Sequence, residues 1–265
     1  MLTSLVLAAL LLATGTFAYL KANRLRLYRQ LEGLQQQILV STPSVAFDAA
    51  DPPPQFDELL AQIDKALPEA TFETIRAEVE QLVTTERSYL PTHKKGGTVA
   101  YETLCNQAPA VISVYLNPEF HAFLSRIVGE PLKPTPINDQ SSCSILFYEK
   151  PGDHIGWHYD HNFYRGRHFT VLVPIVNRGH STGGLSEARL QARMARGDIS
   201  LPTPPNSLVI FEGGKVLHKV TPIADGERRI ILSMTFCTDP SSTLMQGLKR
   251  RIKDTAFFGV RALWT

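Results

Sequence analysis

Cysteine is scarce in this chain, which has 265 residues but only three cysteines. Cys105, Cys143 and Cys237 lie far apart in the sequence, and none of them forms a CxxC pair. An odd number of scattered cysteines describes neither a disulfide framework nor a zinc knuckle. We therefore expect the protein to fold in a reducing compartment.

An excess of charge of either sign is also missing. The chain has 27 basic and 25 acidic residues, which gives a formal net charge of +2. This balance is too close to neutral to indicate a nucleic-acid-binding protein. The basic residues cluster near the two ends, at 21–29 and 246–265, and the body between them is acidic. That distribution favours contact with an anionic membrane surface over contact with nucleic acid.

One long apolar run is present at the beginning of the chain. Residues 2–20 carry no charged side chain, and a helix of that length reaches about 28 Å, close to the hydrocarbon thickness of a bilayer. Residues 1–22 are therefore predicted to be a transmembrane anchor. A cleaved signal peptide is the alternative, although no basic residues precede the run. Because Lys21, Arg24 and Arg29 follow it, the positive-inside rule places the remainder in the cytoplasm.

The rest of the chain divides into three segments. We expect a juxtamembrane segment and proline-rich linker over 23–56, one domain over 57–240, and a basic amphipathic tail over 241–265. Apolar residues at helical spacing predict two helices between residues 59 and 82, separated near Pro68, and a third helix over 118–128.

From about residue 142 the sequence changes to short runs rich in β-forming residues, separated by turn signals. Strands are expected at 142–148, 155–160, 168–177, 185–190, 207–211, 217–222 and 229–237. Many short strands after a helical beginning predict an α+β fold, with a sandwich or barrel supported by helices. The charged insertion at 187–198 is expected to be either a solvated helix or part of a substrate entrance.

The most informative residues are a His-x-Asp pair and a distant histidine. Side chains alternate along a strand, so His158 and Asp160 should face the same side. His218 follows sixty residues later, after another predicted strand. Two imidazoles and one carboxylate leave coordination positions open, as in non-haem Fe(II) oxygenases. A zinc-dependent hydrolase and a binding module without catalysis are the two alternatives.

The segment 142–239 resembles the prolyl-4-hydroxylase-like family of 2-oxoglutarate- and Fe(II)-dependent oxygenases. Five features occur in the family's order, namely a tyrosine before a turn (Tyr148), His-x-Asp at 158–160, a strand from Thr170 to Asn177, His-x-Val-x-Pro from His218, and Gly-x-Arg ending at Arg228.

This resemblance implies a double-stranded β-helix, or jelly roll, that binds iron through His158, Asp160 and His218. These three residues would be both the metal ligands and the catalytic residues. It further implies that 2-oxoglutarate and O₂ are cosubstrates, with ascorbate as a candidate reductant. The expected reaction is hydroxylation of an unidentified peptidyl residue, amino acid or lipid, with release of succinate and CO₂.

The resemblance also implies which residues bind the cosubstrate. Arg228 would pair with the far carboxylate of 2-oxoglutarate, because a guanidinium can bind a carboxylate through two hydrogen bonds. Arg229 is the alternative, since adjacent residues of a strand face opposite sides. Tyr148 would donate a hydrogen bond to the cosubstrate, or would simply pack in the β core.

The C-terminal tail has two open interpretations. Leu248, Ile252, Phe257 and Phe258 fall roughly on one side of a helix, and basic residues occupy the other sides. A helix of this kind can lie among lipid headgroups. Its apolar residues can equally pack on the domain. The bilayer is the expected macromolecular partner, and no nucleic acid is expected.

Overall fold

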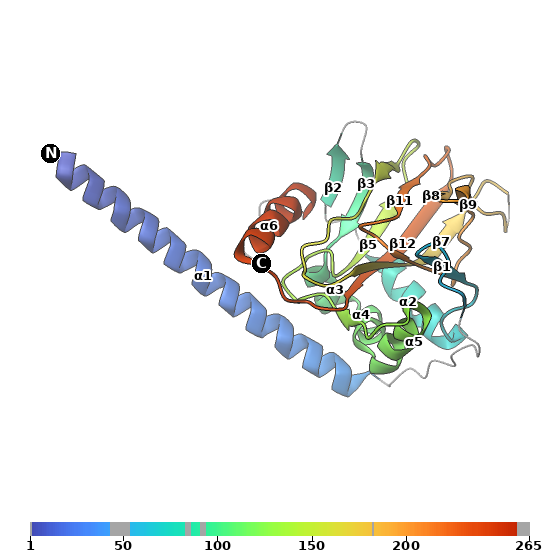
Figure 1. Ribbon diagram of the computed structural model, residues 1–265, viewed down its shortest axis with the longest axis horizontal. Coiled ribbons are helices and arrows are strands. Elements are labelled where there is room, and N and C mark those ends of the chain that lie inside the picture. Colours follow the sequence, from blue (N-terminus) through green and yellow to red (C-terminus); the bar gives the residue numbers. More distant parts are fainter. Residues whose placement is uncertain (1, 43–53, 83–85, 91–93, 182, 259–265) are drawn as a thin grey trace.

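Figure 1 shows a strand-rich body with helices on one side and one long helix that extends away from it. The computed structural model describes residues 2–42, 54–82, 86–90, 94–181 and 183–258. His93 and most of the proline-rich stretch at 52–54 lie outside these residues.

Twelve strands are present among the described residues, and all of their pairings are antiparallel. Their main order is β1-β10-β7-β12-β5-β3-β6-β11-β8-β9, with β2 beside β3 and β4 beside β12. The bounds are β1 (Leu60–Ile63), β2 (Glu86–Leu90), β3 (Lys94–Val99), β4 (Lys133–Pro134), β5 (Cys143–Tyr148), β6 (His154–His158), β7 (His168–Arg178), β8 (Leu190–Met194), β9 (Gly197–Leu201), β10 (Leu208–Glu212), β11 (Leu217–Val220) and β12 (Arg228–Cys237). This antiparallel half-barrel with supporting helices fits a jelly-roll oxygenase core.

Four helices support the sheet, namely α2 (Glu69–Gln81), α3 (Tyr101–Gln107), α4 (Pro109–Leu116) and α5 (Pro118–Val128). The expected helix at 118–128 is confirmed. Asn117 caps its first turn by accepting hydrogen bonds from two backbone N–H groups, and Gly129 ends it with a φ of 76°. The buried ring of Phe120 meets Phe236 of β12 at 6.0 Å between centroids. This packing joins the helical layer to the sheet.

One sequence expectation about local structure is wrong, and one of two open alternatives is excluded. The first expected helix is replaced by β1, whose Leu60 pairs with Phe211 on β10. A short apolar run fits either a helix or a strand. Here the run forms a strand because it can pair with the open edge of β10. The insertion at 187–198 is not a helix either, because β8 and β9 form an antiparallel hairpin there.

The N-terminal apolar run belongs to α1 (Leu2–Ser41), a single helix that continues past the predicted anchor. Its first half exposes large apolar side chains such as Leu10 and Phe17. The helix is long and apolar enough to cross a membrane. Its second half packs on α3 and α4, with Leu31 and Ile38 buried in the core. The part of α1 from Leu27 onward is therefore packed against the folded body.

The basic tail forms α6 (Leu244–Phe258), which lies between α1 and the sheet in Figure 1. Its apolar residues do not share one side. Phe258 is buried, whereas Leu248 and Ile252 are 51% and 62% exposed. Burial and the nearby Arg24 guanidinium of α1 lower the pKa of Arg251, which places the two helices close together at this point.

Candidate metal and cosubstrate site

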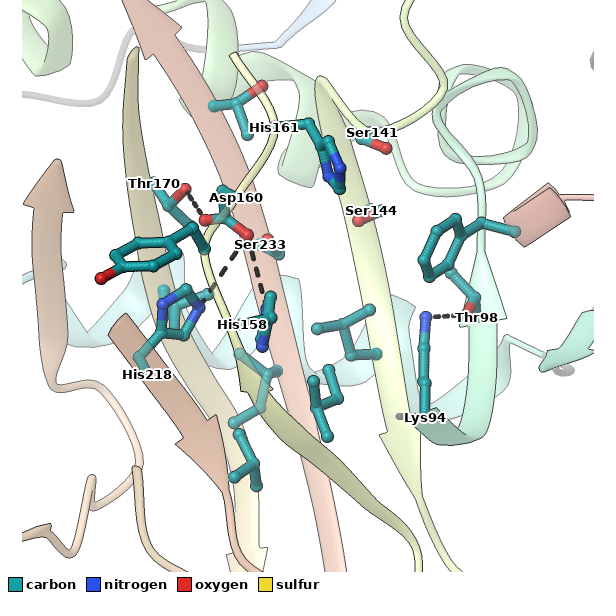
Figure 2. Close-up of a pocket in the computed structure, with 18 of the residues that line it drawn as sticks. Lys94, Thr98, Ser141, Ser144, His158, Asp160, His161, Thr170, His218 and Ser233 are labelled. Carbon is teal, nitrogen blue, oxygen red and sulfur yellow. Dashed lines mark hydrogen bonds and ion pairs between the residues drawn. The ribbon is translucent and has the colours of Figure 1, made fainter. Parts of the chain in front are cut away.

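The strands surround a cavity of about 180 Å³. Its walls come mainly from β3, β5, β6, β7, β11 and β12, and α6 adds Lys253, Phe257 and Phe258. Figure 2 shows His158, Asp160 and His218 grouped on one side of this pocket.

His158, Asp160 and His218 meet because of the register between β6 and β11. His158 lies directly opposite His218 in this antiparallel pair, and Asp160 follows two residues after His158. The Asp160 Oδ1 atom is 3.5 Å from the His158 Nε2 atom and 3.9 Å from the His218 Nε2 atom. One ligand atom from each residue lies within 4.8 Å of the others, so a single metal ion can contact all three.

Backbone carbonyls fix the orientation of both imidazole rings. The Nδ1 atom of His158 is 2.8 Å from the Gly156 carbonyl, and that of His218 is 3.0 Å from the Val216 carbonyl. A carbonyl oxygen only accepts hydrogen bonds, so both Nδ1 atoms carry the proton and donate it. The Nε2 atoms then carry the lone pairs and both lie toward the Asp160 carboxylate, an arrangement typical of metal-binding histidines.

The charges around Asp160 favour its ionised form. Burial alone would raise its pKa, but His218, His158 and the Thr170 hydroxyl together hold the pKa well below its usual range. Burial lowers the pKa of His218, whereas Asp160 raises that of His158 in spite of burial. The site therefore offers one carboxylate and two imidazoles, a donor set that suits Fe(II).

Thr170 and Gly213 hold Asp160 in place. Thr170 Oγ1 donates a hydrogen bond of 2.5 Å to Asp160 Oδ2, and the Asp160 N–H donates one of 2.9 Å to the Gly213 carbonyl. A Cβ atom on Gly213 would lie 2.6 Å from Asp160 Oδ2, so a side chain there would displace the carboxylate. Sequence reasoning missed both residues, although the Gly213-Gly214 pair after a strand was a signal for close approach.

Arg229, and not Arg228, lines the pocket. Its side chain is 1% exposed, and it lies directly opposite Tyr148 in the pairing of β12 with β5. Arg228 points to the surface, where its Nε donates a hydrogen bond of 2.9 Å to Glu149. The prediction that Arg228 faces the pocket is wrong because the register of β12 turns residues 229, 231 and 233 inward.

Arg229 and Tyr148 keep buried polar groups without partners in the described chain. Arg229 Nη2 donates a hydrogen bond of 2.8 Å to Thr203 Oγ1, but its Nε and Nη1 atoms and the Tyr148 hydroxyl are unpaired. Burial lowers the pKa of Arg229 to about 10 and raises that of Tyr148. Buried polar groups normally have partners, so these donors fit an anion such as the far carboxylate of 2-oxoglutarate.

The protein-family comparison covers this whole region. Residues 55–246, which are more than half of the chain, match the family model described as Halogenase D. The chain belongs to the Halogenase D family. Comparison with curated proteins gives no match.

Solved structures with the fold of this Halogenase D member include several oxygenases. The α-ketoglutarate-dependent epimerase SnoN of nogalamycin biosynthesis has a TM-score of 0.56 and 13% identity, over 69% of this chain and 78% of its own. A Burkholderia pseudomallei oxidoreductase of the 2OG-Fe(II) oxygenase family has a TM-score of 0.54 and 12% identity, over 71% and 89%. A prolyl hydroxylase from Trichoplax adhaerens has a TM-score of 0.53 and 14% sequence identity, over 80% of this chain and 91% of its own. At these identities the likeness shows the fold.

Two further histidines of this Halogenase D member line the pocket, although sequence analysis gave them no role. His161 and His168 both belong to the lining. His168 is 6% exposed, its Nδ1 atom has no partner in the described chain, and burial lowers its pKa. The walls near the metal ligands therefore keep polar groups available to a substrate.

Proposed function

We propose that the protein is a 2-oxoglutarate- and Fe(II)-dependent dioxygenase that hydroxylates a C–H bond and releases succinate and CO₂. This proposal depends mainly on the buried polar groups of Arg229 and Tyr148 that have no hydrogen-bond partner in the described chain. They lie in the same pocket as His158, Asp160 and His218. A metal site and an anion site share one cavity, as the binding of a 2-oxoacid next to iron requires.

Each residue has a separate task in this mechanism. His158, Asp160 and His218 hold Fe(II), and Arg229 and Tyr148 bind the far carboxylate of 2-oxoglutarate. When bound, the iron supplies the oxidising chemistry that couples ketoacid cleavage to C–H hydroxylation. The apolar side chains of Leu146, Phe211 and Ile231 line the same pocket and limit the access of water.

A zinc hydrolase explains less of the pocket. Three protein ligands can hold catalytic zinc with one open position. Such a site gives no reason to bury the Arg229 guanidinium with two of its nitrogen atoms unpaired. A binding module without catalysis does not account for two imidazoles whose lone pairs are both oriented toward one carboxylate.

Halogenation is the second candidate reaction, because the matching family model is described as Halogenase D. Three protein ligands leave three positions on a six-coordinate Fe(II), the number that a chelating 2-oxoacid and O₂ require. A halide needs a further position, which Asp160 occupies in this chain. Hydroxylation is therefore favoured.

An anaerobic titration tests the proposed site. Adding 2-oxoglutarate to the Fe(II)-loaded protein should produce a visible charge-transfer band, and the Asp160→Ala variant should give none. With air, wild-type protein should convert 2-oxoglutarate to succinate even without a substrate. A protein that is active with Zn(II) but gives no band with Fe(II) would contradict the proposal. Once a substrate is known, product mass in the presence of chloride separates hydroxylation from halogenation.

We also propose that residues 1–22 anchor the protein in a membrane with the catalytic domain in the cytoplasm. The support is the apolar first half of α1, the basic residues after it, and the position of α6 near Arg24. Protease added to intact cells should leave the domain uncut. Cleavage from outside, or a mature N-terminus near Tyr19, would show that the segment is a signal peptide.

A further inference from the structure

The pocket holds a second buried cation, Lys94, at the beginning of β3. Its side chain is 6% exposed and lines the same cavity as the metal ligands. Figure 2 shows Lys94 and Thr98 across the pocket from His218 and Asp160. Lysine is almost never fully buried unless its charge is paired, so its surroundings need an explanation.

The contacts of Lys94 carry no negative charge. Its Nζ donates a hydrogen bond of 3.1 Å to Thr98 Oγ1 and lies 5.1 Å from the centroid of the Phe257 ring. In the part of the chain that the structure describes, no carboxylate lies within ion-pair distance of Lys94. Burial, with a smaller effect from Lys253, lowers the pKa of Lys94 to about 8. The amine is thus mainly charged at neutral pH without a counter-ion.

The other charges of the pocket have partners. Lys253 forms ion pairs with Asp139 at 3.6 Å and with Asp254 at 2.7 Å. In the proposed function, Asp160 faces Fe(II) and Arg229 faces the far carboxylate of 2-oxoglutarate. Among the described lining residues, Lys94 is the cation that remains without an anionic partner.

A row of hydroxyl groups connects Lys94 with the metal ligands. Ser233, Ser144 and Thr98 come from the adjacent strands β12, β5 and β3, and Ser233 lies directly opposite Ser144. In Figure 2 these residues lead from Asp160 across the sheet toward Lys94. A substrate lying along this row would have polar contacts over its length and a cation at its end.

We propose that the primary substrate carries a carboxylate that pairs with Lys94 while its reactive C–H bond lies beside His158, Asp160 and His218. This inference rests on the proposed function. One ammonium and one hydroxyl balance a monoanion, whereas a phosphate monoester carries about two negative charges at neutral pH. The substrate is therefore a small carboxylic acid, such as an amino acid or a fatty acid, whose carboxylate lies at the far end of this hydroxyl row from the reactive carbon.

The test begins with the metal and cosubstrate alone. Full-length protein in detergent is loaded with Mn(II), which replaces Fe(II) without turnover, and with 2-oxoglutarate, and its thermal unfolding is followed. Both should raise the unfolding temperature of wild-type protein, and Asp160→Ala should lose the effect of Mn(II). Failure at this stage contradicts the proposed function itself.

The second stage tests Lys94 separately, with alanine and hexanoate as acidic probes and alaninamide and hexanamide as neutral counterparts. At least one acid should raise the unfolding temperature further, and its amide should not. Binding should be at least tenfold weaker in Lys94→Gln and in Lys94→Met. Lys95→Gln is the matched control, because the Lys95 Nζ is bonded to the Pro151 carbonyl at the surface. A response to alanine indicates an amino acid substrate, and a response to hexanoate indicates a fatty acid.

Three results would overturn the inference about Lys94 while leaving the metal site intact. The first is that none of the acids binds, and the second is that the amides bind as well as the acids. The third is that the Lys94 variants respond like wild type. The affinity for 2-oxoglutarate should be unchanged in Lys94→Gln. A loss equal to that of Arg229→Gln would instead make Lys94 a cosubstrate ligand and contradict the proposal.

Discussion

His158 and His218 face each other across the antiparallel pair of β6 and β11, with 4.2 Å between their ring centroids. Two imidazoles at this separation repel each other when both are protonated, so the arrangement disfavours the doubly charged pair. Together with Asp160 the two histidines form the candidate metal site. A site built from only three side chains should be sensitive to the loss of any one of them.

Replacing His158, Asp160 or His218 by alanine should remove most Fe(II) binding and all 2-oxoglutarate turnover, because each change deletes one of three protein ligands. Folding should mostly persist, since the three residues lie at the pocket and outside the main apolar cluster. Metal content and succinate formation measure the effect. Wild-type succinate formation by any of these variants would contradict the ligand assignment.

Arg229→Gln should raise the concentration of 2-oxoglutarate needed for half-maximal turnover about tenfold or more, since a charge-assisted hydrogen bond contributes about 1.5–3 kcal/mol. Tyr148→Phe should have a smaller effect in the same direction. Arg228→Gln is the control and should change little, because its partner Glu149 lies at the surface. Equal effects of the two arginine variants would contradict the role of Arg229.

Gly213→Ala should weaken metal binding at least tenfold, because the new Cβ atom would lie 2.6 Å from Asp160 Oδ2 and 2.8 Å from Thr170 Oγ1. Gly214→Ala is the matched control, since its Cβ atom would meet only the Asp160 carbonyl at 3.7 Å. Isothermal titration with Mn(II) compares the two. If both variants bind the metal like wild type, Gly213 does not position Asp160.

Lys94→Met should stabilise the protein at pH 7 when no substrate is present. Burial lowers the pKa of Lys94 to about 8, below its value in the unfolded chain. The charged amine therefore destabilises the fold below pH 8, on the order of 3 kcal/mol. Between pH 8 and about 10.4 the native state releases this proton first, so wild-type stability rises and the advantage of methionine shrinks.

Urea unfolding at pH 7 and pH 10 measures this effect. Lys95→Met should show no comparable gain, because the Lys95 side chain is bonded at the surface. A clear loss of stability in Lys94→Met at pH 7 would mean that Lys94 has an anionic partner in the native protein.

The exposed residues of α6 provide a test of membrane contact that does not depend on the anchor. In a version lacking residues 1–20, Leu248→Ser combined with Ile252→Ser should reduce binding to anionic phospholipid vesicles about tenfold, because apolar surface drives interfacial binding. Val40→Ser is the control, since this even more exposed apolar residue lies at the far end of α1. Cosedimentation with the vesicles measures the difference, and unchanged binding would contradict a lipid contact of α6.

The sequence predicted most of the strands and the residues that meet at the metal site, because both depend on alternation along a strand and on the spacing of short motifs. It did not predict β1, since the open edge of β10 is a tertiary feature. It favoured Arg228 over Arg229 because the register of β12 depends on its pairing with β5 and β7. Lys94 gave no signal either. Its surroundings include Phe257 of α6, which is distant in the sequence.

Because α1 is one helix from Leu2 to Ser41 and its later half is part of the core, the membrane anchor that we propose for residues 1–22 would hold the domain through a stiff helix. The distance along this helix from the last apolar residue of the run, Leu20, to the buried Leu31 is about 16 Å. A flexible tether would let the pocket sample many heights above the bilayer, whereas this helix would hold the pocket at one height. A pocket held at one height would reach only those substrates whose C–H bond lies at the matching distance from the bilayer. The enzyme would then select substrates by this distance as well as by the shape of its pocket.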